Sequence, residues 1–384
     1  MKKIKEMKLK ILLPTILMFV ITLSLKSQTQ IPVVNSKIDV IDIKDGDELF
    51  PRSWSLAPHV KPDIYTSNKI GEYVTFYTDM DSISYLIHPD SVYNFVIVIN
   101  EKDSAFQQLK YTPTYLNVLK GAEDYNREKT IFPDFFYQDS SDVVLKTLRE
   151  EFNLDSIAGG GNEVSRILNL MHWIHDFIPH DGNNENPVVR NAMSLIRVCK
   201  RDERGLNCRG LATVLNECYL SLGIKSRFVT CMPKDSVFSD CHVINMVFSE
   251  DLSKWIWIDP TNDAYILDEQ GQLLGLMEVR QKLINGETVI LNPDANWNNK
   301  ASTLKENYLY KYMAKNLYRF SCPLKSEYDY ETEEKGKIRE NVELIPLDGY
   351  NKTPKISEWT DKQTGVTFKT YKTSNPSQFW AAPN

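Results

Sequence analysis

The chain has 384 residues, with 45 lysines and arginines against 51 aspartates and glutamates, and its formal net charge is −6. This overall charge excludes a basic nucleic-acid-binding protein. Hydrophobic residues make up 42% of the chain and aromatic residues 11%, which excludes a disordered or collagen-like chain as well. At about 100–200 residues per domain, we expect two or three structural units.

Residues 1–27 are typical of a secretory signal peptide. Lysines crowd the first ten positions, and an apolar run follows from Ile11 to Leu25. This run is shorter than the roughly 20 residues that cross a bilayer as a helix, and no later segment is apolar for long enough. We therefore expect a secreted or periplasmic protein with no membrane span in the mature chain; a retained N-terminal anchor is the alternative.

Residues 28–135 predict a β-rich N-terminal module. Short runs of strand character alternate with turn-forming pieces that contain Asp, Gly and Pro. The expected strands are Ile38–Ile43, Tyr73–Thr78, Ser82–Ile87 and Tyr93–Ile99.

Residues 136–300 change from helical to strand periodicity and form the expected core. Apolar residues recur every three or four positions in Glu163–Phe177 and again after Asn207, and shorter helical pieces lie near 140–158 and 188–199. Three strands should follow, at Arg227–Cys231, His242–Phe248 and Lys254–Asp259.

Residues 301–384 form an expected C-terminal extension. Apolar and aromatic residues recur on one side of a helix over Thr303–Phe320. A β-hairpin around Asp361–Gly365 should end the chain.

The six cysteines leave their pairing open. An even number in an exported chain suggests disulfides, yet five of the six lie between residues 199 and 241. No C-x-x-C pair is present, so the usual zinc-ribbon and thioredoxin motifs are excluded. If Cys208 is a free nucleophile, at least one other cysteine is also free or pairs outside the chain.

Cys208 lies at the start of an amphipathic helix, within Gly205-Leu-Asn-Cys-Arg-Gly-Leu-Ala212. Unpaired backbone N–H groups and the helix dipole favour a thiolate at this position. The same N–H groups can hold an oxyanion. By itself, a lone cysteine at a helix start is more often a small apolar residue.

His242 opens one expected strand and Asp259 closes the next. If the two strands form an antiparallel hairpin with the loop Ser249–Leu252, Phe248 faces Ser253, and His242 and Asp259 lie directly opposite each other. Cross-strand neighbours have Cβ atoms about 4.5–5.5 Å apart, close enough for a carboxylate to hold one imidazole nitrogen. The other nitrogen would then face Cys208, as cysteine acyl chemistry requires.

These residues resemble the transglutaminase-like branch of the papain-like cysteine enzymes, of a bacterial secreted type. Four pieces carry the resemblance in order and spacing: the segment around Cys208, Leu222–Val229, His242-Val243 and Trp257–Thr261. The resemblance covers about a quarter of the chain, roughly 163–261. It implies an α+β fold in which the helix that bears the cysteine packs on an antiparallel sheet.

The resemblance also implies the roles of the site residues. Cys208 would be the nucleophile, His242 the general base and acid, and Asp259 the residue that orients His242. Two residues after the histidine the family often has tryptophan, whereas this chain has Ile244. No motif identifies the second oxyanion donor; Asn207 and Trp173 are candidates by chemistry alone.

Other site types find little support. His172 and His175 are three residues apart on a helix with His180 just beyond, but no H-E-x-x-H pattern or acidic residue at a ligand spacing accompanies them, so we expect ordinary helix-surface residues. Asp42–Glu48 lacks the order of a calcium-binding loop and should be a solvated turn. No phosphate-binding loop or G-x-S-x-G motif is present. We predict no metal and no cofactor.

Two classes of function remain. In the first, the protein is an exported cysteine enzyme that attacks an amide of a protein or peptide, forms a thioester at Cys208 and passes the acyl group to water or to an amine. In the second, it is a non-catalytic module that binds a protein or a glycan and keeps the triad as part of its scaffold. The presence of all three residue types favours the enzyme.

Overall fold

The computed structural model describes residues 31–235 and 240–383, and the expected signal peptide at residues 1–27 lies outside them. The chain divides into two compact units between Thr112 and Pro113. This division falls earlier than the boundary at residue 135 that the sequence suggests. Within the described residues, no helix is both long enough and apolar enough to cross a membrane.

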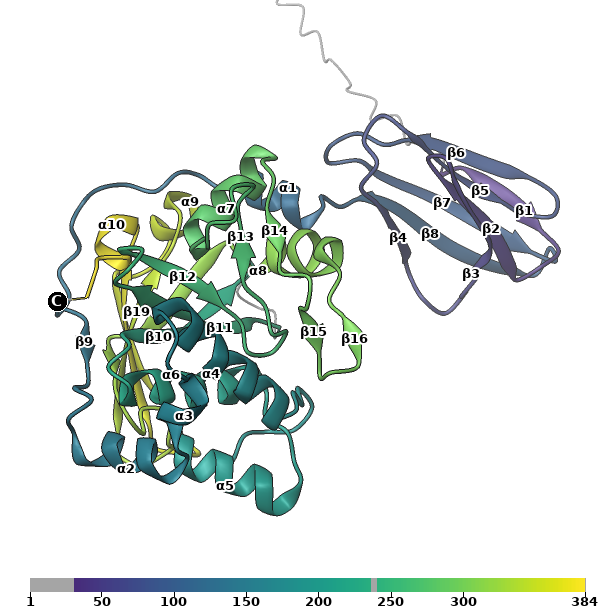
Figure 1. Cartoon of the computed structure of the whole chain (residues 1–384). Helices are drawn as coiled ribbons and strands as arrows, with labels where there is room; N and C mark the ends of the chain where they lie inside the picture. The colour runs from purple at the N-terminus through teal and green to yellow at the C-terminus, as the bar shows by residue number, and fades with distance from the viewer. Residues whose placement is uncertain (1–30, 236–239, 384) are drawn as a thin grey trace, which may run out of the picture. The chain divides into compact units, whose positions relative to one another are not determined.

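The first unit consists of two four-stranded sheets, coloured purple to blue in Figure 1. Both sheets contribute to one core, with Ile41 and Phe76 from one and Phe95 and Leu109 from the other. Each of the four strands expected from the sequence is present. One sheet has the order β1 (Val33–Ser36), β7 (Val92–Ile99), β8 (Asp103–Tyr111), β4 (Asp63–Ser67), and the other β3 (Glu48–Ser55), β2 (Val40–Asp45), β5 (Tyr73–Tyr77), β6 (Ser82–Leu86).

A seven-stranded sheet organises the second unit. Neighbouring strands are antiparallel, except that β19 and β21 are parallel. The expected extension at 301–384 supplies four of the seven strands, so it continues the core sheet. The order is β12 (Lys254–Ile258), β11 (His242–Ser249), β10 (Ser226–Met232), β17 (Arg319–Pro323), β19 (Ile338–Leu344), β21 (Thr367–Thr373), β20 (Ile356–Thr360).

Helices pack around this sheet, so the chain combines helices and sheets as the α+β prediction requires (Figure 1). They are α1 (Tyr115–Lys120), α2 (Val143–Glu151), α3 (Leu154–Ala158), α4 (Glu163–Phe177), α5 (Ala192–Asp202), α6 (Cys208–Ser221), α7 (Leu276–Asn285), π-helix η1 (Glu306–Met313), α8 (Ala314–Asn316), α9 (Leu347–Tyr350) and α10 (Pro376–Phe379). Short strands pair as β9 (Phe136–Tyr137) with β18 (Lys325–Ser326), β13 (Ile266–Leu267) with β14 (Ile290–Leu291), and β15 (Asn296–Trp297) with β16 (Ala301–Ser302).

Strand β11 is buried along its whole length because both faces of the sheet are covered. Val243 packs with Ala212 of α6, and the Asn245 amide donates to the Ala212 carbonyl at 2.9 Å. Ile244 and Met246 point the other way, into the core that η1 and α7 also line. A sheet that is covered on both faces has strands that are apolar along their whole length. Along β11 the sheet therefore lies between α6 and η1, whereas at the His242 end of the strand residues of both helices line one cavity.

The predicted register of the β11–β12 hairpin is wrong by two residues. Ser249 pairs with Lys254 and Phe248 with Trp255, so the four-residue loop begins at Glu250 and not at Ser249. His242 is consequently not directly opposite Asp259. A shift of two residues leaves every side chain on its original face, because side chains alternate with period two. Asp259 is still a diagonal neighbour of His242 on the same face.

The helix expected at Thr303–Phe320 is shorter than the periodicity suggested. It consists of π-helix η1 followed by α8 and ends at Asn316, and Arg319 already begins β17. Phe320 is buried in the sheet, where alternating apolar residues fit a strand as well as a helix end. The π-helical form is rare, and it occurs often at functional sites.

Candidate active site

Cys208 is the first residue of α6, and Asn207 caps this helix. The Asn207 side-chain oxygen accepts from the Gly210 N–H at 3.1 Å and from the Asn186 amide at 2.7 Å. A Cβ atom at Gly210 would meet the Asn186 side chain at 2.8 Å, so only glycine fits there. This capping network fixes the helix start and aims the Cys208 side chain into the cavity described below.

A short backbone bridge brings His180 beside Cys208. The Leu206 N–H donates to the Pro179 carbonyl at 3.0 Å, and the Asp181 N–H donates to the Leu206 carbonyl at 2.7 Å. A Cβ atom at position 205 would lie 2.4 Å from the Pro179 carbonyl oxygen, so Gly205 permits this close approach. The His180 side chain is hydrogen-bonded to the Cys208 thiol.

His242 and Asp259 form a buried pair, with 2% and 0% of their surfaces exposed. His242 Nε2 lies 2.8 Å from Asp259 Oδ2. The same carboxylate oxygen accepts from the Tyr308 hydroxyl at 2.5 Å and from the Asn262 amide at 3.1 Å, while Oδ1 accepts from the Thr261 N–H at 2.9 Å. The remaining nitrogen of His242, Nδ1, is left for the Cys208 thiol, with which the ring is hydrogen-bonded. The structure thus joins all three residues.

The electrostatics of this cluster favour a thiolate beside an imidazolium. Burial raises the pKa of the Cys208 thiol, but hydrogen bonds from His180 and His242, together with the charge of His242, lower it to about 6. Burial lowers the pKa of His242, but the Asp259 carboxylate outweighs it and raises this pKa to about 10. The pKa of Asp259 stays below its usual value despite burial, chiefly because of His242. Between these values Cys208 is ionised and His242 is protonated.

A cavity of about 630 Å³ opens in front of Cys208. Cys208 and His242 line it together with Asn207 and His180, and Tyr308 and Tyr312 line it from η1. The Tyr312 ring meets the His242 ring edge to face, with centroids 5.4 Å apart. The volume is typical of a site that holds a small molecule or a short peptide segment.

Hairpin β15–β16 fixes the orientation of His180. The Trp297 indole N–H donates to His180 Nδ1 at 3.2 Å, and the side chain of Asn298 bonds both the N–H and the carbonyl of His180. An indole N–H can only donate, so Nδ1 accepts and the ring proton resides on Nε2 when His180 is neutral. His180 therefore presents an N–H donor to the cavity.

The structure separates the two oxyanion candidates from the sequence. Asn207 lines the cavity, although its side-chain oxygen is occupied by the helix cap. Trp173 lies on α4 and stacks on Phe177, with ring centroids 5.8 Å apart, and it is not among the residues that line the cavity. Sequence reasoning missed His180 and Tyr308, because each reaches the site from a distant segment.

His175 differs from the sequence prediction, and the structure also answers the question of cysteine pairing that the sequence left open. His175 is buried, with Nδ1 3.0 Å from the Pro260 carbonyl and Nε2 2.9 Å from Asn296 Oδ1, so the expected position on the helix surface is wrong for it. His172 contacts Asp263. None of the six cysteines, all of which lie in the described part of the chain, forms a disulfide.

Residues 150–260 match the transglutaminase-like superfamily. This match confirms the resemblance that the sequence motifs carried, and the matched segment includes Cys208, His242 and Asp259. A comparison with curated proteins finds no match. Among solved structures, a proposed cysteine protease from Cytophaga hutchinsonii matches at 18% identity with a TM-score of 0.24, over 34% of this chain and 40% of that one. The match thus spans less than half the length of that protein.

Proposed function

We propose that the protein is an exported transglutaminase-like cysteine enzyme, secreted or periplasmic, that acts on amide bonds of a protein or peptide through a thioester at Cys208. The observation that carries this proposal is the hydrogen-bonded series from Cys208 through His242 to Asp259, open to a cavity at the cysteine end. The match of residues 150–260 to the superfamily supports it.

The chemistry follows from this arrangement. The Cys208 thiolate attacks the carbonyl carbon of the amide, and the carbonyl oxygen takes the negative charge. As the C–N bond breaks, His242 gives its proton to the leaving nitrogen, and a thioester remains. Water or a primary amine then attacks the thioester, His242 takes a proton from it, and the Cys208 thiolate leaves with a carboxylic acid or a new amide as product. Asp259 keeps Nδ1 of His242 aimed at the sulfur.

Two groups are placed to stabilise the charged oxygen. The first N–H groups of a helix lack partners within it, and Cys208 is at this position in α6. His180, which also lines the cavity, adds a side-chain N–H, because its other nitrogen accepts a hydrogen bond from Trp297. We therefore assign the second oxyanion donor to His180 in place of Asn207 or Trp173.

A panel of amide substrates, incubated with and without a primary amine, tests the proposal. Mass spectrometry should find the acyl group on Cys208 and either the acid or the amine adduct as product. Cys208→Ala should abolish both, whereas Cys241→Ser, at the other half-buried cysteine of the cavity, should preserve turnover. If products form equally well with Cys208→Ala, the mechanism is wrong, and binding without catalysis becomes the remaining function.

A further inference from the structure

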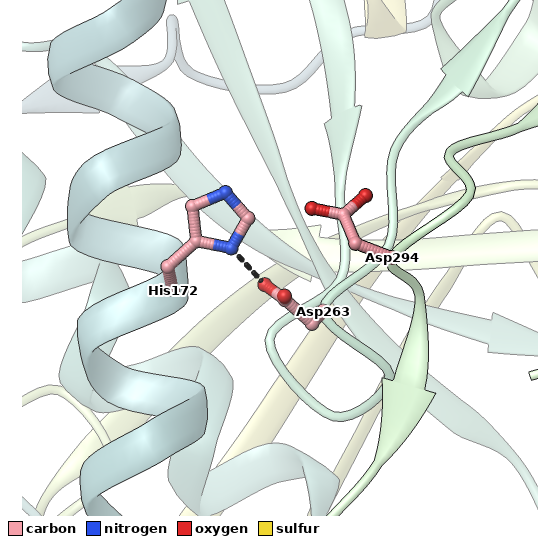
Figure 2. A group of neighbouring side chains, drawn as sticks. All are labelled: His172, Asp263 and Asp294. Atoms are coloured by element: carbon pink, nitrogen blue, oxygen red, sulfur yellow. Dashed lines mark hydrogen bonds and ion pairs between the residues drawn. The ribbon is translucent and has the colours of Figure 1, made fainter. Parts of the chain in front are cut away.

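A second cluster of metal-ligating side chains includes Asp263, a residue of the loop that follows Asp259. His172 projects from α4, and Asp263 and Asp294 come from two loops; Figure 2 shows the three side chains pointing toward one another. One ligand atom from each residue lies within 4.8 Å of the others. The two aspartates are 91 or more residues away from His172 in the chain, so no local sequence pattern indicated this cluster.

The three groups differ in exposure in a way that suits an ion site. Asp263 is 6% exposed, His172 is partly exposed and Asp294 is exposed. His172 Nδ1 and Asp263 Oδ1 share a hydrogen bond at 2.5 Å. An ion bound to both atoms would replace the proton of this bond, and the two atoms would then stand about 3–4 Å apart, given metal–ligand distances of about 2.0–2.2 Å. The exposed Asp294 side chain has the freedom to close the remaining gap, and the open side admits water as further ligands.

A buried asparagine joins the backbone of Asp263 to one carboxylate oxygen of Asp294. Asn292, 2% exposed, donates through Nδ2 to the Asp263 carbonyl at 2.9 Å and to Asp294 Oδ1 at 2.8 Å. Its own side-chain oxygen accepts from the Tyr265 N–H at 2.8 Å. This leaves Oδ2 of Asp294 available to an ion. Residues that fix ligands in this way are typical of metal sites.

The charge around the cluster is negative. The groups whose charges act on His172 are Asp263, Asp294 and Asp176, all carboxylates. The carboxylates of Asp263 and Asp294 are close enough to repel each other, and the one imidazole beside them, which is bonded to Asp263, offsets this repulsion only in part. The charge of a divalent cation would offset the negative charges of both carboxylates.

We propose that His172, Asp263 and Asp294 bind one first-row divalent cation, of the Zn²⁺ or Mn²⁺ class. One imidazole nitrogen with two carboxylate oxygens suits such ions, whereas Ca²⁺ and Mg²⁺ take oxygen ligands almost exclusively. The site is separate from the cavity at Cys208, whose lining includes none of the three residues.

The position of the site gives it a structural role. Asp263 belongs to the loop that begins at Asp259, and this loop is closed by hydrogen bonds of 2.9 and 3.0 Å between the backbones of Asp259 and Ala264. His175, one helical turn after His172, holds the same loop through the Pro260 carbonyl. An ion between α4 and Asp263 would fix the loop at a second point. Any effect on turnover rests on the proposed function; binding itself does not.

The test measures ion binding directly, in the Cys208→Ala background so that the thiolate cannot take the ion. The full mature chain is titrated with Zn²⁺ and, separately, Mn²⁺ by calorimetry, and elemental analysis after dialysis gives the stoichiometry. We expect one ion per chain and a higher melting temperature with the ion bound. Asp294→Asn, an exposed and conservative change, should weaken binding by more than about tenfold.

A matched control separates the site from general negative charge. Asp176→Asn removes an exposed neighbouring carboxylate of α4 that acts on the site through its charge but is not a proposed ligand. It should leave the stoichiometry unchanged and weaken binding far less than Asp294→Asn does, because solvent screens an exposed charge. The proposal is overturned if neither ion binds saturably, or if Asp294→Asn binds as tightly as the unchanged site. Because the readouts are binding and melting temperature, the outcome is independent of whether Cys208 catalyses any reaction.

Discussion

Cys208 and Cys241 are both half-buried beside the same cavity, yet their thiols differ in acidity. Burial raises the pKa of both thiols, but hydrogen bonds from His180 and His242 outweigh it at Cys208 and lower that pKa to about 6, whereas the pKa of Cys241 stays above its ordinary value of 9.0. The contrast depends on which groups face each sulfur, because the degree of exposure is similar. Because of this difference in pKa, we expect the two thiols to react with an alkylating reagent at different rates.

Alkylation should reveal this difference. At pH 6 about half of Cys208 is thiolate, against less than about a thousandth of Cys241, the fraction that its ordinary pKa of 9.0 would give. The weaker nucleophilicity of the low-pKa thiolate offsets about twentyfold of that ratio. Iodoacetamide should therefore label Cys208 at least about twentyfold faster, as followed by peptide mass spectrometry. The His242→Ala variant should lose most of this preference. Equal labelling rates in the folded protein would contradict an activated Cys208.

The pH dependence of turnover should follow the same pair. Activity should rise as Cys208 ionises near pH 6 and fall near pH 10 as His242 loses the proton that the leaving nitrogen needs. The two groups interact, so the measured values describe the pair. Asp259→Asn removes the charge that raises the pKa of His242 and should move the upper limb of the kcat/KM profile to lower pH. An upper limb that stays in place would show that Asp259 does not set this pKa.

His180 is expected to act on the transition state more than on substrate binding. His180→Ala should lower kcat by roughly 10²–10³-fold with a smaller change in KM, the usual effect of losing an oxyanion donor. His180→Gln keeps a side-chain N–H and should recover part of the rate. Trp297→Phe removes the indole N–H that bonds His180 Nδ1 and should give an intermediate loss. Steady-state kinetics of the three variants are the measurement; a loss confined to KM would count against this role.

At the scale of elements, periodicity predicted what lies along one helix or strand. Glu163–Phe177 and the strands around His242 agree with the sequence analysis because each buries a regular apolar face. The hairpin register was missed because Ser249 continues the strand, and its hydroxyl bonds Glu163 of α4, a contact with no local signal. The face of Asp259 was still correct, since an error of two residues preserves it.

The sequence could not predict the contacts between elements that lie far apart in the chain. Tyr308 reaches Asp259 from a π-helix 49 residues later in the chain, and His180 is held by a hairpin more than 110 residues after it. Over the eight residues of η1, the longer period of a π-helix cannot be distinguished from that of an α-helix, so the sequence predicted an ordinary helix there. The contacts that orient the triad are thus set by tertiary packing.

The π-helix offers a direct test of this packing. Tyr308→Phe removes the hydroxyl that donates to Asp259 at 2.5 Å. A hydrogen bond to a charged group contributes about 1.5–3 kcal/mol, and Asp259 keeps its other donors, so kcat/KM should fall by roughly tenfold. Tyr310→Phe, two residues along the same helix and partly buried, serves as the matched control and should retain full activity. If both variants behave alike, the effect comes from the helix and not from the Asp259 contact.

At the scale of the whole molecule, the candidate active site and the β-rich module belong to different units. The core of the first unit is built from residues between Val34 and Leu109, and it includes no residue of the second. Every side chain of the candidate active site, from His180 to Tyr312, belongs to the second unit, which starts at Pro113. Each unit thus buries its own apolar residues, as independent domains do.

Residues 113–384 should therefore fold and act without the first unit. On a small amide substrate, this shortened chain should give the kcat/KM of the full mature protein, because the cavity, the triad and His180 are all retained. Circular dichroism and a single cooperative melt establish folding, and Cys208→Ala in the shortened chain is the control for activity. A folded 113–384 chain with no turnover would show that the β-rich module completes the site. Full activity on the small amide together with slower turnover of a protein substrate would assign this module to substrate recognition.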